Sequence, residues 1–205
     1  MTKVKICGMR REEDISFANE LRPDMVGFVF WKPSKRYVSA EEASILRSKL
    51  DNGITPVGVF VDENPRVVAD IANDGIVDIV QLHGAEDEEY IHGLRRLTGV
   101  PIIRTFCVKT ERDLDEAASS SADMILLDNG KGTGQTFDWT LIRDIGRDFI
   151  LSGGLSVSNV SEAVRRFRPF AVDVSSAVET DGFKDRDKME RFIGTVRSSD
   201  AGVDF

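Results

Sequence analysis

A cysteine close to the N-terminus, Cys7, stands where a side chain can do chemistry. Val4 and Ile6 alternate with polar residues as in a strand, and this run leads directly into Cys7 and Gly8. A thiol at the point where a strand opens into a loop can face a ligand, and a glycine beside it lets the backbone approach that ligand closely. The alternative is that Cys7 is a small buried apolar residue, as free cysteines usually are.

A carboxylate, Asp128, directly follows the four apolar residues 124–127. A strand there would hold this carboxylate at the mouth of a site, and a carboxyl group shielded in a cleft has the raised pKa that a general acid needs. The glycine-rich loop 129–135 comes next; no helix opens at its third glycine, Gly134, so it is not a dinucleotide-binding fingerprint. The alternative for Asp128 is a solvated surface residue.

Two loops of small residues are candidates for binding phosphate through backbone N–H groups. Gly153 and Gly154 precede a helical pattern, and Ser175 and Ser176 precede a short helical turn. Backbone N–H groups at such places bind phosphate without net charge. Each loop alone could be a tight turn or a helix cap. As a pair they favour a phosphate site.

Two further side chains are candidates for binding the rest of such a ligand. Arg36 lies in the basic loop 32–37, where a guanidinium could bind a carboxylate through two hydrogen bonds. His83 directly follows an apolar run and could donate to the same ligand. The alternatives are a solvated arginine and a histidine that caps the next turn.

Apolar strand-like runs alternate with amphipathic helical patterns along the whole chain. The predicted strands are residues 4–7, 25–30, 55–61, 79–82, 101–106, 124–127, 149–151 and 171–174. The predicted helices are residues 11–21, 40–50, 65–73, 87–97, 111–119, 139–145, 157–167 and 186–196. Strict alternation indicates an α/β fold with a parallel sheet. Eight units of about 26 residues fit a compact (β/α)₈ TIM barrel, and an open doubly wound sheet is the competing fold.

A weak repeat distinguishes the two ends of the predicted barrel. Asp24, Asp78 and Asp123 each stand where an even-numbered strand begins, about two βα units apart. The starts of barrel strands serve stability, so we assign these aspartates no catalytic role. Chemistry is expected at the opposite ends of the strands, where all the candidates above lie, and phosphate at the loops after strands 7 and 8.

Composition narrows the class of protein. The chain has 205 residues, 41% of them apolar and 30% charged, which predicts one globular domain over residues 1–205. A net charge of −8 without a basic block argues against nucleic acid as a partner. No apolar run reaches about 18 residues, which argues against a membrane span. Two distant cysteines, two histidines and no export signal predict a cytoplasmic protein without metal or disulfide.

Taken together, motifs along nearly the whole chain resemble those of the phosphoribosylanthranilate isomerase family. The matching segments are residues 5–9 (KICGM), 27–30 (GFVF), 34–38 (SKRYV), 57–60 (VGVF), 80–84 (VQLHG), 127–128 (LD), 132–134 (GTG), 152–155 (SGGL), 174–176 (VSS) and 178–179 (VE). Each motif alone is weak, and their common order makes the match specific.

This resemblance implies a ribulose-phosphate-binding (β/α)₈ barrel that works without cofactor or metal. It implies an Amadori rearrangement of tryptophan biosynthesis, from N-(5-phosphoribosyl)anthranilate to 1-(2-carboxyphenylamino)-1-deoxyribulose 5-phosphate. Asp128 would be the general acid that opens the furanose ring, and Cys7 the general base that takes the C2′ proton. Arg36 would bind the anthranilate carboxylate beside His83. The phosphate would be held by backbone amides around a set of small residues: Gly134, Gly153, Gly154, Ser175 and Ser176.

Three points stay open on the sequence. Ala177 stands where the family usually has glycine, which puts the geometry of the phosphate turn in doubt. The ordinary pKa of a thiol, about 8.5, must be shifted toward neutrality if Cys7 is the base. The competing functions are a histidine-pathway sugar isomerase, which uses two aspartates, and a catalytically silent phosphate-binding barrel. A small phosphorylated molecule is the expected partner, and the chain is expected to be a monomer or a homodimer.

Overall fold

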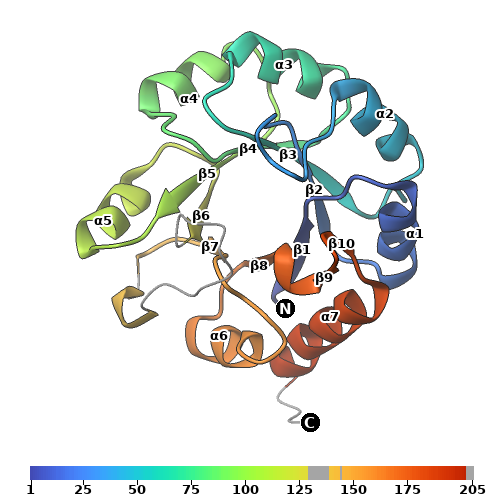
Figure 1. Cartoon of the computed structure of the whole chain (residues 1–205). Helices are drawn as coiled ribbons and strands as arrows, with labels where there is room; N and C mark the ends of the chain where they lie inside the picture. Colours follow the sequence, from blue (N-terminus) through green and yellow to red (C-terminus); the bar gives the residue numbers. More distant parts are fainter. Residues whose placement is uncertain (129–138, 144, 202–205) are drawn as a thin grey trace.

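The computed structural model describes residues 1–128, 139–143 and 145–201. Eight parallel strands close into a barrel in the order in which they occur along the chain, and helices surround it (Figure 1). The strands are β1 (Lys3–Cys7), β2 (Met25–Val29), β3 (Thr55–Phe60), β4 (Ile79–Leu82), β5 (Ile102–Cys107), β6 (Met124–Asp128), β7 (Phe149–Leu151) and β8 (Ala171–Val174). The predicted (β/α)₈ barrel is confirmed, and the open sheet is excluded.

The helices between the strands begin at residues that can cap them. They are α1 (Glu12–Leu21), α2 (Ala40–Ser48), α3 (Pro65–Asn73), α4 (Glu88–Leu94), α5 (Glu111–Ser119), α6 (Val160–Phe167) and α7 (Arg186–Asp200). Before α2, the Ser39 side chain accepts a hydrogen bond from the Glu42 N–H, and Glu42 accepts one from the Ser39 N–H. Asp87 and Asp185 cap α4 and α7 in a similar way.

The predicted helix 139–145 is wrong. Among the described residues of this segment, 139–143 and 145, the structure has only a three-residue 3₁₀ helix, η1 (Trp139–Leu141). Apolar side chains of this segment, such as Ile142, do pack against the core. The segment is short, and Gly146 ends it in a left-handed conformation with φ 70°. The spacing of the apolar residues therefore correctly indicated that these side chains are buried, but over so few residues it could not distinguish a helix from an irregular segment.

Successive side chains of each strand face opposite sides of the barrel wall. The outward side packs against the helices in the main core, which includes Val4 and Ile6 of β1. The inward side forms a small apolar cluster inside the barrel, made of Met25, Val57, Ile103, Leu126, Ile150 and Ala171. On β1 the inward positions are Lys5 and Cys7, which alternate with Val4 and Ile6. The inner wall of the barrel is thus apolar in one layer and polar toward the ends of the strands.

Two of the three aspartates at the strand starts bind backbone N–H groups, and the third, Asp78, pairs with the Arg47 side chain. Asp24 Oδ2 accepts a hydrogen bond from the Val4 N–H at 2.9 Å. Asp123 Oδ2 accepts one from the Ile102 N–H at 2.8 Å. These carboxylates tie neighbouring strands together at the end of the barrel that lies away from the candidate catalytic residues.

A small hairpin that the sequence did not predict follows β8. It consists of β9 (Glu179–Thr180) and β10 (Phe183–Lys184), and it lies beside β1 and β2 in Figure 1. The guanidinium groups of Arg10 and Arg11 lie 4.2 and 4.4 Å from the centre of the Phe183 ring. Arg10 also donates to the Gly182 carbonyl at 2.8 Å. The hairpin is therefore fastened to the loop that follows Cys7.

Candidate active site

One cavity of about 430 Å³ opens at the C-terminal ends of the strands. It is lined by nearly all the candidate residues that the sequence singled out: Cys7, Arg36, His83, Asp128, Gly153, Gly154, Ser175 and Ser176. Gly134 lies outside the described residues. The fold therefore brings together side chains from both ends of the chain, as the barrel hypothesis requires.

Cys7 is the last residue of β1, half-buried at the wall of the cavity. Its register partner on β2 is Gly27. A Cβ atom at Gly27 would lie 2.8 Å from the Cys7 Sγ, which is shorter than any normal contact. The glycine is needed here to give the thiol room. The motif 27–30 thus has a physical meaning that the sequence alone did not reveal.

The charges around Cys7 act in opposite directions on the thiol. Burial raises the pKa of Cys7, Lys5 lowers it, Asp173 raises it and Lys184 lowers it; the net result is a pKa above the ordinary value. The side chains around Cys7 therefore do not supply the shift toward neutrality that a base requires. The reason is that desolvation of the thiolate outweighs the attraction of the nearby cations.

Lys5 is a charged residue inside the barrel that sequence reasoning missed. Its side chain is fully buried, and its Nζ lies 2.9 Å from Asp173 Oδ1. The two residues are register partners on β1 and β8. Burial works to lower the pKa of Lys5, but attraction by Asp173 and Cys7 outweighs it and leaves this pKa raised. A signal was present, because Lys5 and Cys7 occupy alternate positions of one strand and must share a face.

Asp128 is the last residue of β6, and its side chain lines the cavity. It pairs in register with Cys107 of β5, and its carbonyl accepts a hydrogen bond from the Val108 N–H at 2.9 Å. Asp128 as a whole is 8% exposed. It is therefore held by a regular strand at the barrel mouth, as predicted, and is shielded from bulk water.

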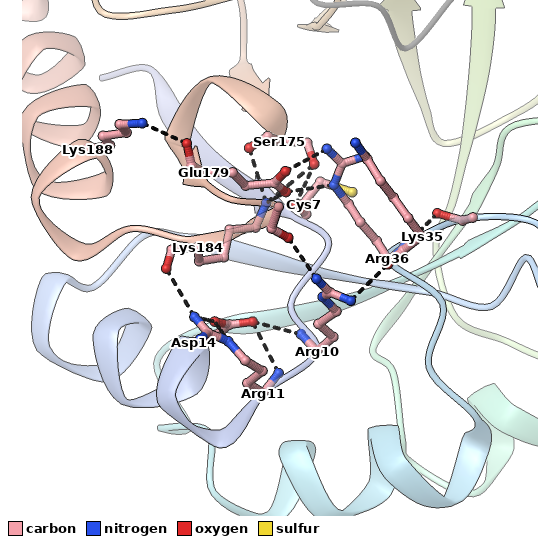
Figure 2. Close-up of polar contacts among 12 residues, drawn as sticks. Cys7, Arg10, Arg11, Asp14, Lys35, Arg36, Ser175, Glu179, Lys184 and Lys188 are labelled. Carbon is pink, nitrogen blue, oxygen red and sulfur yellow. Dashed lines mark hydrogen bonds and ion pairs between the residues drawn. The ribbon is translucent and has the colours of Figure 1, made fainter.

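Arg36 already has a carboxylate partner from the hairpin. Its Nε and Nη2 donate to Glu179 Oε1 and Oε2 at 2.6 and 2.8 Å (Figure 2). Lys184 Nζ also lies 2.7 Å from Glu179 Oε1. Burial works to raise the pKa of Glu179, but the hydrogen bonds and charges of Arg36 and Lys184 prevail and lower it. Glu179, which the sequence marked only as part of the motif 178–179, is the residue that orients Arg36.

Gly8 explains how Arg36 reaches this position. It has a φ of 89°, which only glycine adopts readily, and a Cβ atom there would overlap the Cδ of Arg36. The arginine side chain therefore crosses directly over the backbone of the loop after β1. The sequence suggested that the glycine next to Cys7 lets the backbone approach a ligand. In the structure, Gly8 lets the backbone approach the Arg36 side chain.

His83 is fixed by two neighbours on the inner wall. Gln81 Nε2 lies 3.0 Å from His83 Nδ1, and Thr105 Oγ1 lies 3.2 Å from the same atom. These two contacts fix the orientation of the imidazole ring through Nδ1, and His83 lines the cavity.

The two candidate phosphate loops border the same cavity. Gly153 and Gly154 have φ values of 80° and 72°, so both require glycine. Asn159 Nδ2 donates to the Gly154 carbonyl at 3.0 Å and so holds this turn. The Ser175 hydroxyl donates to the Cys7 carbonyl at 2.9 Å, which ties the second loop to β1. Ala177 has no positive φ and fits the short 3₁₀ helix η2 (Ser176–Val178) without strain.

Comparison with known proteins decides the family. The model of the family described as N-(5'-phosphoribosyl)anthranilate (PRA) isomerase matches residues 4–195. The chain belongs to this family. A relative from Clostridium acetobutylicum named N-(5'-phosphoribosyl)anthranilate isomerase is 44% identical over 206 residues, which cover 96% of this chain and 98% of the relative.

Solved structures of the family agree with this barrel. The phosphoribosylanthranilate isomerase of Thermotoga maritima matches it with a TM-score of 0.88 at 42% identity, over 97% of this chain and 100% of that one. A family structure in complex with reduced 1-(o-carboxyphenylamino)-1-deoxyribulose 5-phosphate matches with a TM-score of 0.86 at 41% identity, over 97% and 100% of the two chains. The fold class and the family predicted from the sequence are confirmed.

Within residues 1–128, 139–143 and 145–201, no three His, Cys, Asp or Glu side chains gather in a way that could hold a metal ion. None of the helices in the same ranges combines the length and apolar character that a membrane crossing requires. The cavity offers a thiol, carboxylates, cations and backbone N–H groups, which suit proton transfer on an anionic substrate.

Proposed function

We propose that Cys7 and Asp128 transfer the protons of the Amadori rearrangement in this chain. As a member of the family, the protein is an isomerase of N-(5'-phosphoribosyl)anthranilate in tryptophan biosynthesis. The observation that supports the proposed roles is that a thiol and a carboxylate, from β1 and β6, line one cavity at the catalytic end of the barrel. Ring opening needs a proton donor and enolisation needs a proton acceptor, and these two residues are suited to the two tasks.

In the first step, the Asp128 carboxyl group donates its proton to the furanose ring oxygen. The bond between that oxygen and C1′ breaks, and the nitrogen lone pair forms a C1′=N iminium. In the second step, the Cys7 thiolate takes the proton from C2′, the electrons of that C–H bond form the C1′=C2′ bond of an enol, and the C1′=N π electrons return to nitrogen. The enol then ketonises: the C2′ hydroxyl proton passes to the Asp128 carboxylate and C1′ takes a proton from the Cys7 thiol, which restores both residues. The sum is an isomerisation in which neither electrons nor atoms are lost.

The raised pKa of Cys7 is compatible with this order of events. The thiol is mainly protonated before ring opening, because its pKa lies above the ordinary value. The iminium that follows is a cation close to the thiol. A cation favours the thiolate form, and it acidifies the neighbouring C–H bond at the same time. The base is thus strengthened at the step that uses it.

Arg36 and His83 are proposed to bind the anthranilate carboxylate. Glu179 occupies Nε and Nη2 of Arg36, and the Nη1 group lies outside that ion pair and can donate to a substrate carboxylate. Backbone N–H groups near Gly153 and Ser176, with the other loop residues Gly154, Ser175 and Gly134, are proposed to hold the phosphate.

A fluorescence assay that follows loss of the anthranilate adduct tests the two catalytic roles. Cys7→Ser and Asp128→Asn should each lower kcat by at least ~10²-fold while the affinity for product is largely retained, because each removes a positioned proton-transfer group. Cys107→Ser is the matched control for the thiol, and it should keep its turnover. Near wild-type turnover by either site variant would remove that residue from the mechanism.

The assembly and location of the chain complete the proposal. One solved relative, from Thermotoga maritima, is described as dimeric. We expect this chain to be a monomer or a homodimer, to form a single domain over residues 1–205 and to act in the cytoplasm on a small phosphorylated substrate. Light scattering on the purified protein distinguishes the two assemblies, and fractionation of cells tests the location.

A further inference from the structure

A buried ammonium group lies beside the proposed base. Lys5 and Cys7 are two residues apart on β1, so both side chains project into the barrel. Lys5 is 0% exposed, and such burial is rare for a lysine unless it is paired. Its partner Asp173 reaches it from β8 at 2.9 Å, and the other Asp173 oxygen lies 3.4 Å from Ser152 Oγ. The barrel could fill this place with apolar side chains, as it does in its apolar layer.

The fixed charges around the thiol do not cancel. Three cations face it from different elements: Lys5 on β1, Lys184 on β10 and Arg36 in the loop after β2. Two carboxylates balance them, since Asp173 pairs with Lys5, and Glu179 pairs with both Lys184 and Arg36. The sum of these five groups is one positive charge. A thiolate at Cys7 would neutralise it.

We propose that Lys5 is a positioning residue whose buried ammonium, anchored by Asp173, holds the thiolate form of Cys7 while the C2′ proton is removed. The inference rests on the proposed role of Cys7 as the base. It assigns to Lys5 a task that an apolar residue of the same length could not perform.

Two observations separate Lys5 from the other cations. It shares the inward face of β1 with the thiol, and after burial its charge is the largest influence on the pKa of Cys7. The attraction also acts in the other direction, because Asp173 and Cys7 together keep the buried lysine protonated. Lys184 and Arg36 share the single carboxylate of Glu179 and so carry the net positive charge, whereas Lys5 is paired with Asp173 and influences the thiol through its place on the same face of β1.

The rate at which iodoacetamide alkylates Cys7 measures this effect without substrate. Only the thiolate reacts, and mass spectrometry of peptides separates Cys7 from Cys107. Lys5→Met keeps the length of the side chain and removes its charge. At pH 8 we expect alkylation about 3- to 30-fold slower, since losing a neighbouring cation raises a pKa by about 1–3 units and higher nucleophilicity offsets part of the loss.

Two more variants complete the test: one should change the alkylation rate in the opposite direction, and the other is a control that should not change it. Asp173→Asn leaves Lys5 charged and removes the opposing carboxylate, so alkylation should be about threefold faster or more. Lys49→Met removes a lysine that is ion-paired with Glu12 on the outer surface, and it should leave the rate unchanged. If Lys5 served packing alone, alkylation would not become slower in Lys5→Met and faster in Asp173→Asn.

A double variant covers the case in which Lys5→Met leaves Asp173 buried without a partner and fails to fold. Lys5→Met with Asp173→Asn removes both charges of this buried pair, and alkylation should be slower than in wild type because Lys5 influences the thiol more than Asp173 does. Alkylation at or above the wild-type rate in folded Lys5→Met, or in the double variant, would overturn the inference.

Activity supplies the second measurement. In Lys5→Met, kcat/KM should reach its plateau at a higher pH than in wild type, while KM stays close to the wild-type value. These experiments distinguish a failure of the proposed role of Cys7 from a failure of the proposed role of Lys5. If Cys7→Ser stays active while Lys5→Met slows alkylation, the proposed base is wrong and Lys5 still controls the thiol. If Cys7→Ser is inactive while the alkylation rate of Cys7 in Lys5→Met equals that of wild type, only the proposed role of Lys5 is wrong.

Discussion

The replacement of Gly27 by alanine tests whether the position of the Cys7 sulfur matters. Gly27 has no positive φ, so alanine can adopt its backbone conformation without strain. The new methyl group, however, would lie 2.8 Å from Cys7 Sγ and 3.1 Å from Cys7 Cα. An unstrained contact requires about 3.8 Å, so the sulfur must move by about 1 Å.

The size of the kinetic effect follows from this displacement. A shift of about 1 Å in a reacting group can lower a rate by about 10²-fold. We therefore expect kcat of Gly27→Ala to fall by about that factor, while KM changes little because Arg36 and the phosphate loops stay in place. Overpacking should also lower the free energy of unfolding by about 1–3 kcal/mol.

The same fluorescence assay gives kcat, and thermal unfolding gives the stability. Gly53→Ala is the matched control, because a Cβ atom at Gly53 would have no other atom within 4 Å and that residue has no positive φ either. It should leave both kcat and KM unchanged. Wild-type turnover in folded Gly27→Ala would refute the reasoning, since it would show that the thiol can be displaced without consequence.

The remaining predictions concern the pH profile, the carboxylate site and the stability face. Because the pKa of Cys7 is raised, kcat/KM should keep rising as the pH increases past 8.5 and the thiol deprotonates; a plateau below pH 8 would contradict this. Arg36→Ala should raise KM by about 10- to 100-fold through loss of a charge-assisted hydrogen bond, with a smaller effect on kcat, and an unchanged KM would place the carboxylate elsewhere. Asp24→Ala removes the acceptor of the Val4 N–H and should lower the free energy of unfolding by about 1–3 kcal/mol in denaturant titrations, with kcat unchanged; a loss of activity in the folded variant would contradict its assignment to the stability face.

The features that the sequence predicted best depend on the alternation of strands and helices. A strand must end where its apolar run ends, so the positions of Cys7, His83 and Asp128 at one end of the barrel follow from the closed topology. The helix predicted over residues 139–145 lacked such support. Its few apolar residues pack against the core from a three-residue 3₁₀ helix followed by an irregular segment.

The contacts that the sequence did not reveal join residues far apart in the chain. Glu179 lies 143 positions from Arg36, and Lys5 lies 168 positions from Asp173. A lysine in a short strand is ordinarily taken as solvent-facing, and only closure of the barrel shows that Lys5 faces inward. The β9–β10 hairpin has strands of two residues each, which is too short for any periodicity. The alternation along β1 could have shown that Lys5 shares a face with Cys7, but the distant partners that complete the electrostatic environment of the thiol could not be found from the sequence.

Kinetic isotope effects test most directly whether a thiol and a carboxylate divide the two proton transfers between them. The measurement is kcat with substrate that carries deuterium at C2′, in Cys7→Ser and in Asp128→Asn. If Cys7 is the base, its loss makes the C–H cleavage rate-limiting, and Cys7→Ser should show a clear primary isotope effect. Loss of the acid makes ring opening rate-limiting, so Asp128→Asn should show none. The reverse pattern, or a primary effect in both variants, would contradict the assignment of base and acid.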